Sequence, residues 1–132
     1  MGKVPYSELH CRSNFSFLQG ASHPEQLVEQ AVALELQSLA LTDRNGLYGI
    51  VRFAQTARAL GLPTVFGAEL QCTVGEAVGD IVVIARNPRG YAHLSSAISA
   101  GQLAGSKEQP VFGIEQLADF SVGDWWVLTG GR

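Results

Sequence analysis

Short stretches rich in apolar residues, separated by polar turns, predict a series of strands along the chain. Val4–His10 and Ser38–Thr42 have the length and apolar content of strands, and the second is mostly apolar, as in strands covered on both faces. Thr64–Thr73, Asp80–Arg86 and Trp125–Thr129 are rich in β-branched and aromatic residues, which also favour strands. Polar turns separate the five stretches.

Between these stretches the apolar residues recur with a helical period. Ser22 is a suitable N-cap for a helix that ends near Leu36, and Leu47–Leu60 has apolar residues on one side and a glycine directly after it. Asn87 and the proline after it are typical of the start of a third helix. Ile114–Asp119 is long enough for one or two helical turns.

The order strand, helix, strand, helix, strand, strand, helix, strand predicts an α/β fold with a largely parallel sheet and flanking helices. Two architectures fit this order. One is an open, doubly wound sheet, and the other is a partial (β/α) barrel, because a complete barrel needs about 250 residues. With 132 residues, the chain has room for one domain.

Composition narrows the possible functions. Nine Lys and Arg residues against 12 Asp and Glu residues give a net charge of -3, which disfavours binding of nucleic acid through bulk charge. The arginines at positions 52, 58, 86 and 89 are therefore interpreted as solvated surface charges. Cys11 and Cys72 suit free thiols in a reducing compartment. Without an apolar run of about 20 residues or a signal peptide, we expect a cytoplasmic protein and no membrane span.

Three side chains with metal-ligating chemistry follow three different strands. His10, Asp43 and Glu69 lie at or near the carboxyl ends of predicted strands, where α/β proteins place their functional sites. These residue types bind divalent cations. At strand ends they also commonly serve as hydrogen-bonding or capping groups, so spacing alone is a weak indication of a metal site.

Four motifs carry a more specific signal because they occur in order along the chain. The four motifs are Glu8–Leu18 with Gly20–Ser22, Leu41–Asp43 with Gly46–Gly49, Phe66–Glu69, and Gly90–Tyr91 with Leu94–Ser95. With these motifs the chain resembles the PHP (polymerase and histidinol phosphatase) domain of bacterial C-family DNA polymerase III alpha subunits. Its first motif is closer to the error-prone branch of that family than to the main replicative subunit.

This resemblance implies a distorted (β/α) barrel of seven strands with a metal cluster at its carboxyl end. Residues 1–132 would then be the N-terminal portion of a single PHP domain, that is, an incomplete barrel. The metal-ligand positions of the family fall on His10, Asp43 and Glu69. Arg12 replaces the second histidine of the family's His-x-His motif. Arg44 and Asn45 replace the last two residues of its Thr-Asp-His-Asp motif.

The two arginines change the chemistry expected at this site. A guanidinium has no lone pair to give to a metal and carries a fixed positive charge that repels a cation. We therefore predict that Arg12 and Arg44 form ion pairs with Asp43 and Glu69. No metal, cofactor or catalytic residue is then expected in this part of the family's domain.

The resemblance also gives expectations for function. The parent would be an error-prone DNA polymerase active in damage-induced mutagenesis and translesion synthesis, with its nucleotidyl-transfer site elsewhere in the polypeptide. This chain would be a structural or docking part that meets DNA only through the parent. An open sheet edge could also let two copies associate. The alternatives are a metal-dependent phosphoesterase and a free-standing ligand-binding α/β module.

Overall fold

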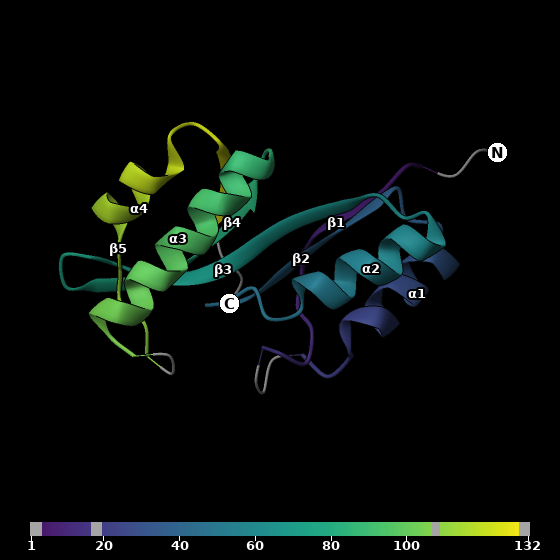
Figure 1. The fold of residues 1–132 in the computed structure, drawn as a ribbon, viewed down its shortest axis with the longest axis horizontal. Coiled ribbons are helices and arrows are strands. Elements are labelled where there is room, and N and C mark those ends of the chain that lie inside the picture. Colours follow the sequence, from purple (N-terminus) through teal and green to yellow (C-terminus); the bar gives the residue numbers. More distant parts are fainter. Residues whose placement is uncertain (1–3, 17–19, 107–108, 130–132) are drawn as a thin grey trace.

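A six-stranded sheet runs through the molecule, with helices packed against it (Figure 1). The computed structural model describes residues 4–16, 20–106 and 109–129. Phe17 and Leu18, at the end of the first motif, lie outside the described residues. The elements are β1 (Ser7–Cys11), α1 (Pro24–Ala33), β2 (Ser38–Arg44), α2 (Ile50–Leu60), β3 (Thr64–Val74), β4 (Ala77–Ala85), α3 (Pro88–Ala104), β5 (Phe112–Gly113), α4 (Ile114–Ser121) and β6 (Trp125–Thr129).

The strands lie in the order β1-β2-β3-β4-β6, and the short β5 pairs with the far end of β3. Pairing is parallel between β1 and β2, between β2 and β3, and between β3 and β5. It is antiparallel between β3 and β4 and between β4 and β6. The sheet is therefore mixed rather than largely parallel. Only Gly75 and Glu76 separate β3 from β4, and so short a link permits only an antiparallel hairpin.

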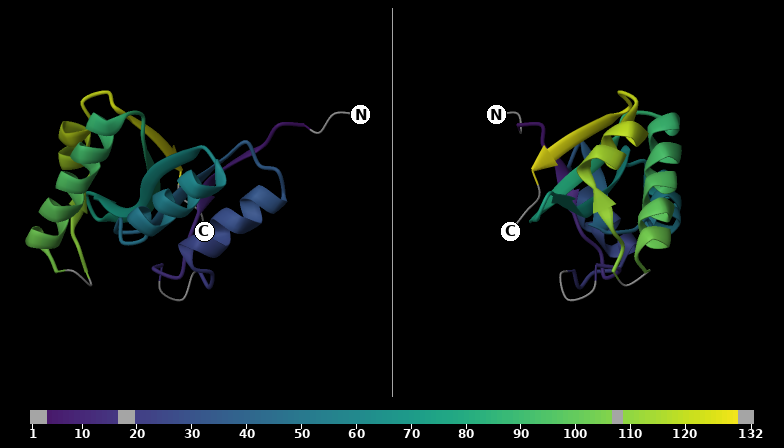
Figure 2. Two further views of the ribbon diagram at one scale, coloured as in Figure 1. Left: turned by 45° about the vertical axis from the view of Figure 1, so that its right-hand side comes forward. Right: turned by 90° about the vertical axis from the view of Figure 1, so that its left-hand side faces the viewer.

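Two pairs of helices divide the core into two parts. Figures 1 and 2 show α1 beside α2 and α3 beside α4, with the long strand β3 extending from one pair to the other. Val28, Leu41 and Phe53 belong to the buried cluster under the first pair. Leu70 and Leu94 belong to the cluster under the second pair. The predicted α/β fold is confirmed as a curled half-barrel sheet with flanking helices.

Most helix boundaries lie within a few residues of the prediction. His23, rather than Ser22, is the N-cap of α1, because the Gln26 side chain accepts a hydrogen bond from the His23 backbone N–H at 2.8 Å. Gly61 ends α2 in a left-handed conformation with φ 72°. The Asn87 side chain caps α3 by accepting the Gly90 N–H. No helix in the described ranges is long and apolar enough to cross a membrane.

The two ends of the sheet are formed by β1 and β6, and no further strand among the described residues pairs with their outer sides. Neighbouring side chains of β6 point to opposite faces. Trp125 is buried against α3, whereas Trp126 is 59% exposed. Leu9, Val65 and Leu128 line a hollow together with Trp126. The half barrel therefore leaves apolar side chains uncovered near both of its open edges.

Candidate functional site

Three adjacent strands bring most of the predicted site residues together. His10 lies in β1, Arg44 at the end of β2, and Glu69 within β3. Arg44 and Glu69 are direct partners in the parallel register of β2 and β3, so their side chains share one face of the sheet. Arg12 follows β1 directly and reaches the same point. The structure therefore brings these four residues together, with Glu69 in the middle of its strand rather than at its end.

Glu69 is the centre of this site, and its side chain is fully buried. The Glu69 Oε2 atom lies 2.7 Å from His10 Nε2 and accepts a hydrogen bond from Arg12 Nη2 at 2.5 Å. Its Oε1 atom accepts a hydrogen bond from Arg44 Nη1 at 3.1 Å. Arg44 Nη1 also lies 3.4 Å from Asp80 Oδ2. We call these five residues the Glu69 cluster.

The Glu69 cluster holds its central carboxylate in the charged form. Burial by itself raises the pKa of Glu69, because a charge loses hydration in the interior. The hydrogen bonds and charges of Arg12 and His10 act in the opposite direction and outweigh burial, so the pKa of Glu69 is below its ordinary value. The carboxylate is thus ionised at neutral pH and bound to permanently charged partners.

Asp43 lies outside the Glu69 cluster, which corrects the prediction that it pairs with an arginine. Its Oδ1 atom accepts hydrogen bonds from the Ser13 backbone N–H at 2.6 Å and from Ser16 Oγ at 2.7 Å. Its Oδ2 atom accepts from Ser13 Oγ at 2.7 Å. Asp43 pairs in register with Ala68, a residue of the core under α3, so it points to the opposite face from Arg44. Asp43 therefore anchors the loop after β1.

Three residues of this region were missed by sequence reasoning. Ser13 and Ser16 are buried, and Ser16 Oγ also accepts the Arg44 backbone N–H at 2.9 Å. Their spacing in a polar loop was the available signal. Asp80 becomes visible as a partner only once the β3–β4 hairpin is known. Asn45, predicted to replace a site residue, instead accepts a hydrogen bond from the Gln71 N–H at 3.2 Å through its side chain.

The donor set at this site does not fit a divalent cation. Both oxygens of Glu69 and both of Asp43 already accept hydrogen bonds. Two guanidinium groups occupy the space beside Glu69 and cannot act as ligands. Burial raises the pKa of the Cys11 thiol to about 11, so Cys11 is a neutral thiol at pH 7. Within the described ranges, no group of three or more His, Cys, Asp or Glu residues is placed to hold a metal.

Comparison with known proteins gives a consistent family match. The family model described as "PHP domain" matches residues 8–132. An error-prone DNA polymerase of Cutibacterium acnes is 48% identical over 98% of this chain, and one of Mycolicibacterium paratuberculosis is 47% identical over the same share. The chain spans 12% of the length of each of these relatives.

Two solved structures have a similar fold. A protein of Bifidobacterium adolescentis assigned as a metal-dependent phosphoesterase aligns with a TM-score of 0.62 and 25% identity, over 77% of this chain and 35% of its own. An amidohydrolase of Chromobacterium violaceum, solved with sulfate and no metal, aligns with a TM-score of 0.61 and 26% identity, over 74% of this chain and 34% of its own.

Proposed function

This chain belongs to the PHP domain family, and from that premise we propose that it is a catalytically silent PHP half barrel with a structural or docking role in an error-prone DNA polymerase. Residues 1–132 then form the N-terminal portion of one PHP domain. The enzymatic activity belongs to the longer polypeptide, where this part supports or positions the polymerase body. The chain itself carries no catalytic residue in this proposal.

The arrangement around Glu69 is the observation that supports silence. A metal-dependent hydrolase needs carboxylate and imidazole lone pairs directed at the cation. In this chain the buried carboxylate of Glu69 is directed at Arg12 and Arg44 instead. The ion pairs connect the carboxyl ends of β1 and β2 to the middle of β3. The arginines could thus hold these three strands together in the way that a metal cluster would.

Metal content and hydrolysis together test this proposal. We expect the purified chain, incubated with Zn²⁺ or Mn²⁺ and then dialysed, to hold much less than one metal ion per chain by elemental analysis. We also expect no metal-dependent hydrolysis of p-nitrophenyl phosphate. One tightly bound metal per chain, together with hydrolysis that His10→Ala abolishes, would contradict the proposal. Arg12→His with Arg44→His is the matched variant that returns imidazoles to both positions.

A metal-dependent phosphoesterase remains the second candidate function. The similarity to the Bifidobacterium adolescentis protein favours it, because that protein is assigned this activity. His10 and Glu69, whose side chains lie together, also keep residue types that can ligate a cation. In this case Arg12 and Arg44 would have to swing away from Glu69 to admit the metal. The metal and hydrolysis assays above decide between the two candidates.

The activity of the parent polypeptide is likewise part of the proposal. Its support is the identity of 48% and 47% to proteins named error-prone DNA polymerase, of which this chain matches 12%. The parent would carry out DNA-directed nucleotidyl transfer during translesion synthesis in the cytoplasm, and this chain would meet DNA only within the parent. The net charge of -3 agrees with the absence of a separate DNA-binding role.

A free-standing ligand-binding module is the remaining alternative, and its sheet would have to be closed by its own residues. Among the described residues, no strand pairs with the outer sides of β1 and β6, which speaks against this alternative. The unpaired sides favour the proposal that isolated chains associate through a sheet edge.

A further inference from the structure

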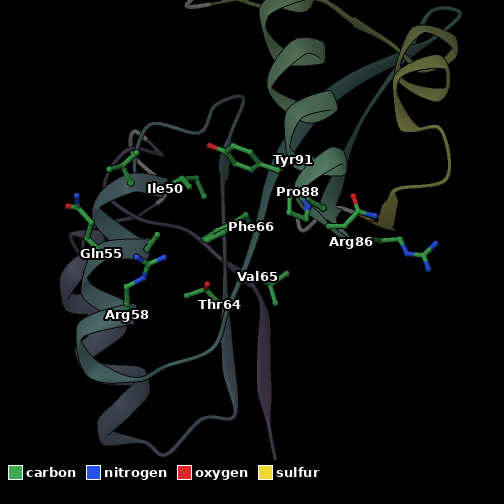
Figure 3. Close-up of a pocket in the computed structure, with 13 residues that line it drawn as sticks. Ile50, Gln55, Arg58, Thr64, Val65, Phe66, Arg86, Pro88 and Tyr91 are labelled. Carbon is green, nitrogen blue, oxygen red and sulfur yellow. The ribbon is translucent and has the colours of Figure 1, made fainter.

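A groove on the helix side of the sheet lies apart from the Glu69 cluster. It has a volume of about 670 Å³ and lies between α2 and the start of α3, with the first residues of β3 as its floor (Figure 3). Figure 3 shows Phe66 on the floor, Tyr91 extending toward it from α3, and Ile50 at the side. The rings of Phe66 and Tyr91 meet edge to face, with their centroids 5.9 Å apart. The floor of the groove is therefore apolar and partly aromatic.

The two walls are also largely apolar. On the wall formed by α2, the side chain of Val51 is apolar and yet 65% exposed. Pro88, the first residue of α3, stands on the other wall. Val51 and Pro88 therefore continue the apolar lining of the floor up to the solvent-facing rim, which makes one contiguous apolar patch. The volume is in the range that holds several bulky side chains.

The charge in the groove has one sign. No carboxylate is among the described residues that line it, and Arg58 contributes a guanidinium from α2. Arg58 has no ion-pair partner within the described ranges. Arg86 also borders the groove, but its side chain points away in Figure 3 and donates to the Gly123 carbonyl at 2.9 Å. Arg58 is therefore the group available for an incoming anion.

Arg52 on the same helix provides a contrast. Its Nε and Nη2 atoms donate to the two oxygens of Glu25 at 2.6 and 3.0 Å. Arg52 is not a lining residue of the groove. The helix α2 thus carries one arginine whose charge is already paired and one arginine whose charge faces an apolar groove. Among the described residues, Arg58 is thus the arginine of α2 whose charge is not already paired with a carboxylate at the groove.

We infer that this groove docks a peptide segment of the longer polymerase polypeptide, one that carries bulky apolar side chains beside an Asp or Glu. This inference rests on the proposed function. The apolar side chains of the segment cover Phe66 and Val51, and its carboxylate pairs with Arg58. The charge of Arg58 selects the acidic residue, and the length of the relatives supplies the segment, because this chain spans 12% of the Cutibacterium acnes polymerase.

Peptide binding to the intact chain tests this inference. Overlapping synthetic peptides tile the parts of the Cutibacterium acnes and Mycolicibacterium paratuberculosis polymerases that this chain does not match. Fluorescence anisotropy measures the binding of each peptide to the chain. We expect one segment with apolar and acidic residues to bind, and its affinity to fall as salt is raised, because the ion pair is screened.

Variants of α2 connect that binding to the groove. Val51→Asp and Arg58→Gln are each expected to weaken peptide binding, raising the dissociation constant about tenfold, as is common for a central contact of an interface. The matched control Arg52→Gln removes the paired arginine of the same helix and is expected to leave the affinity within about twofold. Replacing the peptide's acidic residue by its amide should weaken binding to the native chain. The same replacement should not weaken binding to Arg58→Gln any further, because the ion pair is already absent from that variant.

Other outcomes overturn the inference in distinguishable ways. If Val51→Asp binds the peptide as well as the native chain while Trp126→Asp does not, docking takes place at the open face of the sheet. The proposed docking role then survives and the groove is wrong. If no tiled peptide binds, the groove inference fails, whereas the silent-site proposal is still judged by its own metal assay. Thermal unfolding of every variant confirms that each one is folded.

Discussion

At the scale of single residues, Glu69 is the side chain on which most of the site depends. Its carboxylate is fully buried and is shared by two guanidinium groups that are each about a quarter exposed or less. Glu69→Gln would leave Arg12 and Arg44 without their carboxylate. We expect a loss on the order of 3 kcal/mol in the free energy of unfolding, because removing one partner of a buried ion pair leaves the other charge uncompensated. Urea unfolding at pH 7 measures it.

Glu76→Gln is the matched control for this substitution. Glu76 lies in the β3–β4 turn and is exposed, so the same chemical change should alter the free energy of unfolding by less than about 0.5 kcal/mol. Equal losses in the two variants would show that the Glu69 cluster contributes no particular stability.

The lowered pKa of Glu69 also gives a pH dependence with a defined sign. In the unfolded chain a glutamate titrates near pH 4.3, and in the folded chain Glu69 titrates lower. Its contribution to stability is therefore complete above about pH 5 and is lost as the pH falls through the folded pKa. The difference in stability between the native chain and Glu69→Gln should shrink on acidification, as measured by urea unfolding at several pH values. A constant difference would contradict this.

Asp124 contributes equally to the pH dependence of stability in the native chain and in Glu69→Gln. Hydrogen bonds from Arg89 and then Asn87 lower the pKa of Asp124 to about 2. Both proteins keep this group, so both lose its contribution at the same low pH and it cancels in the difference. Asp124 is expected to contribute to the acid sensitivity that Glu69→Gln retains below about pH 4.

Sequence reasoning predicted the ion pairs of these residues only in part. The fixed charges of Arg12 and Arg44 were enough to predict that both pair with a carboxylate, and both pair with Glu69. The partner of each arginine depends on which face of the strand it occupies, and that follows from register. Arg44 lies opposite Glu69, and Asp43 lies opposite Ala68. One step along a strand reverses the face, so Asp43 could not be assigned from spacing alone.

At the scale of elements, the contact between α3 and β6 is close enough to require a glycine. A Cβ atom on Gly90 would collide with the backbone oxygen of Asp124, which is fixed because it accepts the Arg86 N–H at 2.9 Å. The Gly90 carbonyl in turn accepts the Trp125 Nε1–H at 2.8 Å. Gly90→Ala is expected to lower the free energy of unfolding by about 1 to 2 kcal/mol, because the steric cost exceeds the gain in helix propensity.

Gly79 in β4 is the control for that substitution. A Cβ atom there meets nothing within 4 Å, and the residue is not in the left-handed region. Gly79→Ala should be neutral or slightly stabilising, since it restricts the unfolded chain. Thermal unfolding of both variants measures the contrast, and a stable Gly90→Ala would mean that α3 can move away from β6.

The elements themselves were largely predictable because each carries its own pattern. The C-terminal end of α2 follows from Gly61, and the start of α3 follows from Asn87, because the local chemistry of each residue fixes a boundary. The two-residue β5 was missed, since a pair of residues has no period. The position of β4 was predicted approximately, but its antiparallel direction was not. Its direction depends on the tight turn at Gly75, where φ is 60°, rather than on its apolar sequence.

At the scale of the whole molecule, the half barrel ends in β1 and β6, and no further strand among the described residues pairs with their outer sides. Trp126, Val127 and Leu128 are 59%, 55% and 38% exposed on the terminal strand β6. In the longer relatives, further chain is available to cover this strand. A strand with a free edge and apolar side chains tends to pair with another chain. We therefore expect the isolated chain to associate as its concentration rises.

Val127→Lys tests this expectation, because a lysine on an edge strand opposes pairing with a second strand. Sedimentation velocity over a range of concentrations should show a rising mean sedimentation coefficient for the native chain and a flat one for Val127→Lys. Val74→Lys is the matched control, since Val74 is 58% exposed but lies in β3, which is paired by β4 at that point. It should associate like the native chain. A native chain that stays monomeric throughout would show that the open edge of β6 is protected by the chain's own residues, which is the behaviour of a free-standing module rather than of a half barrel.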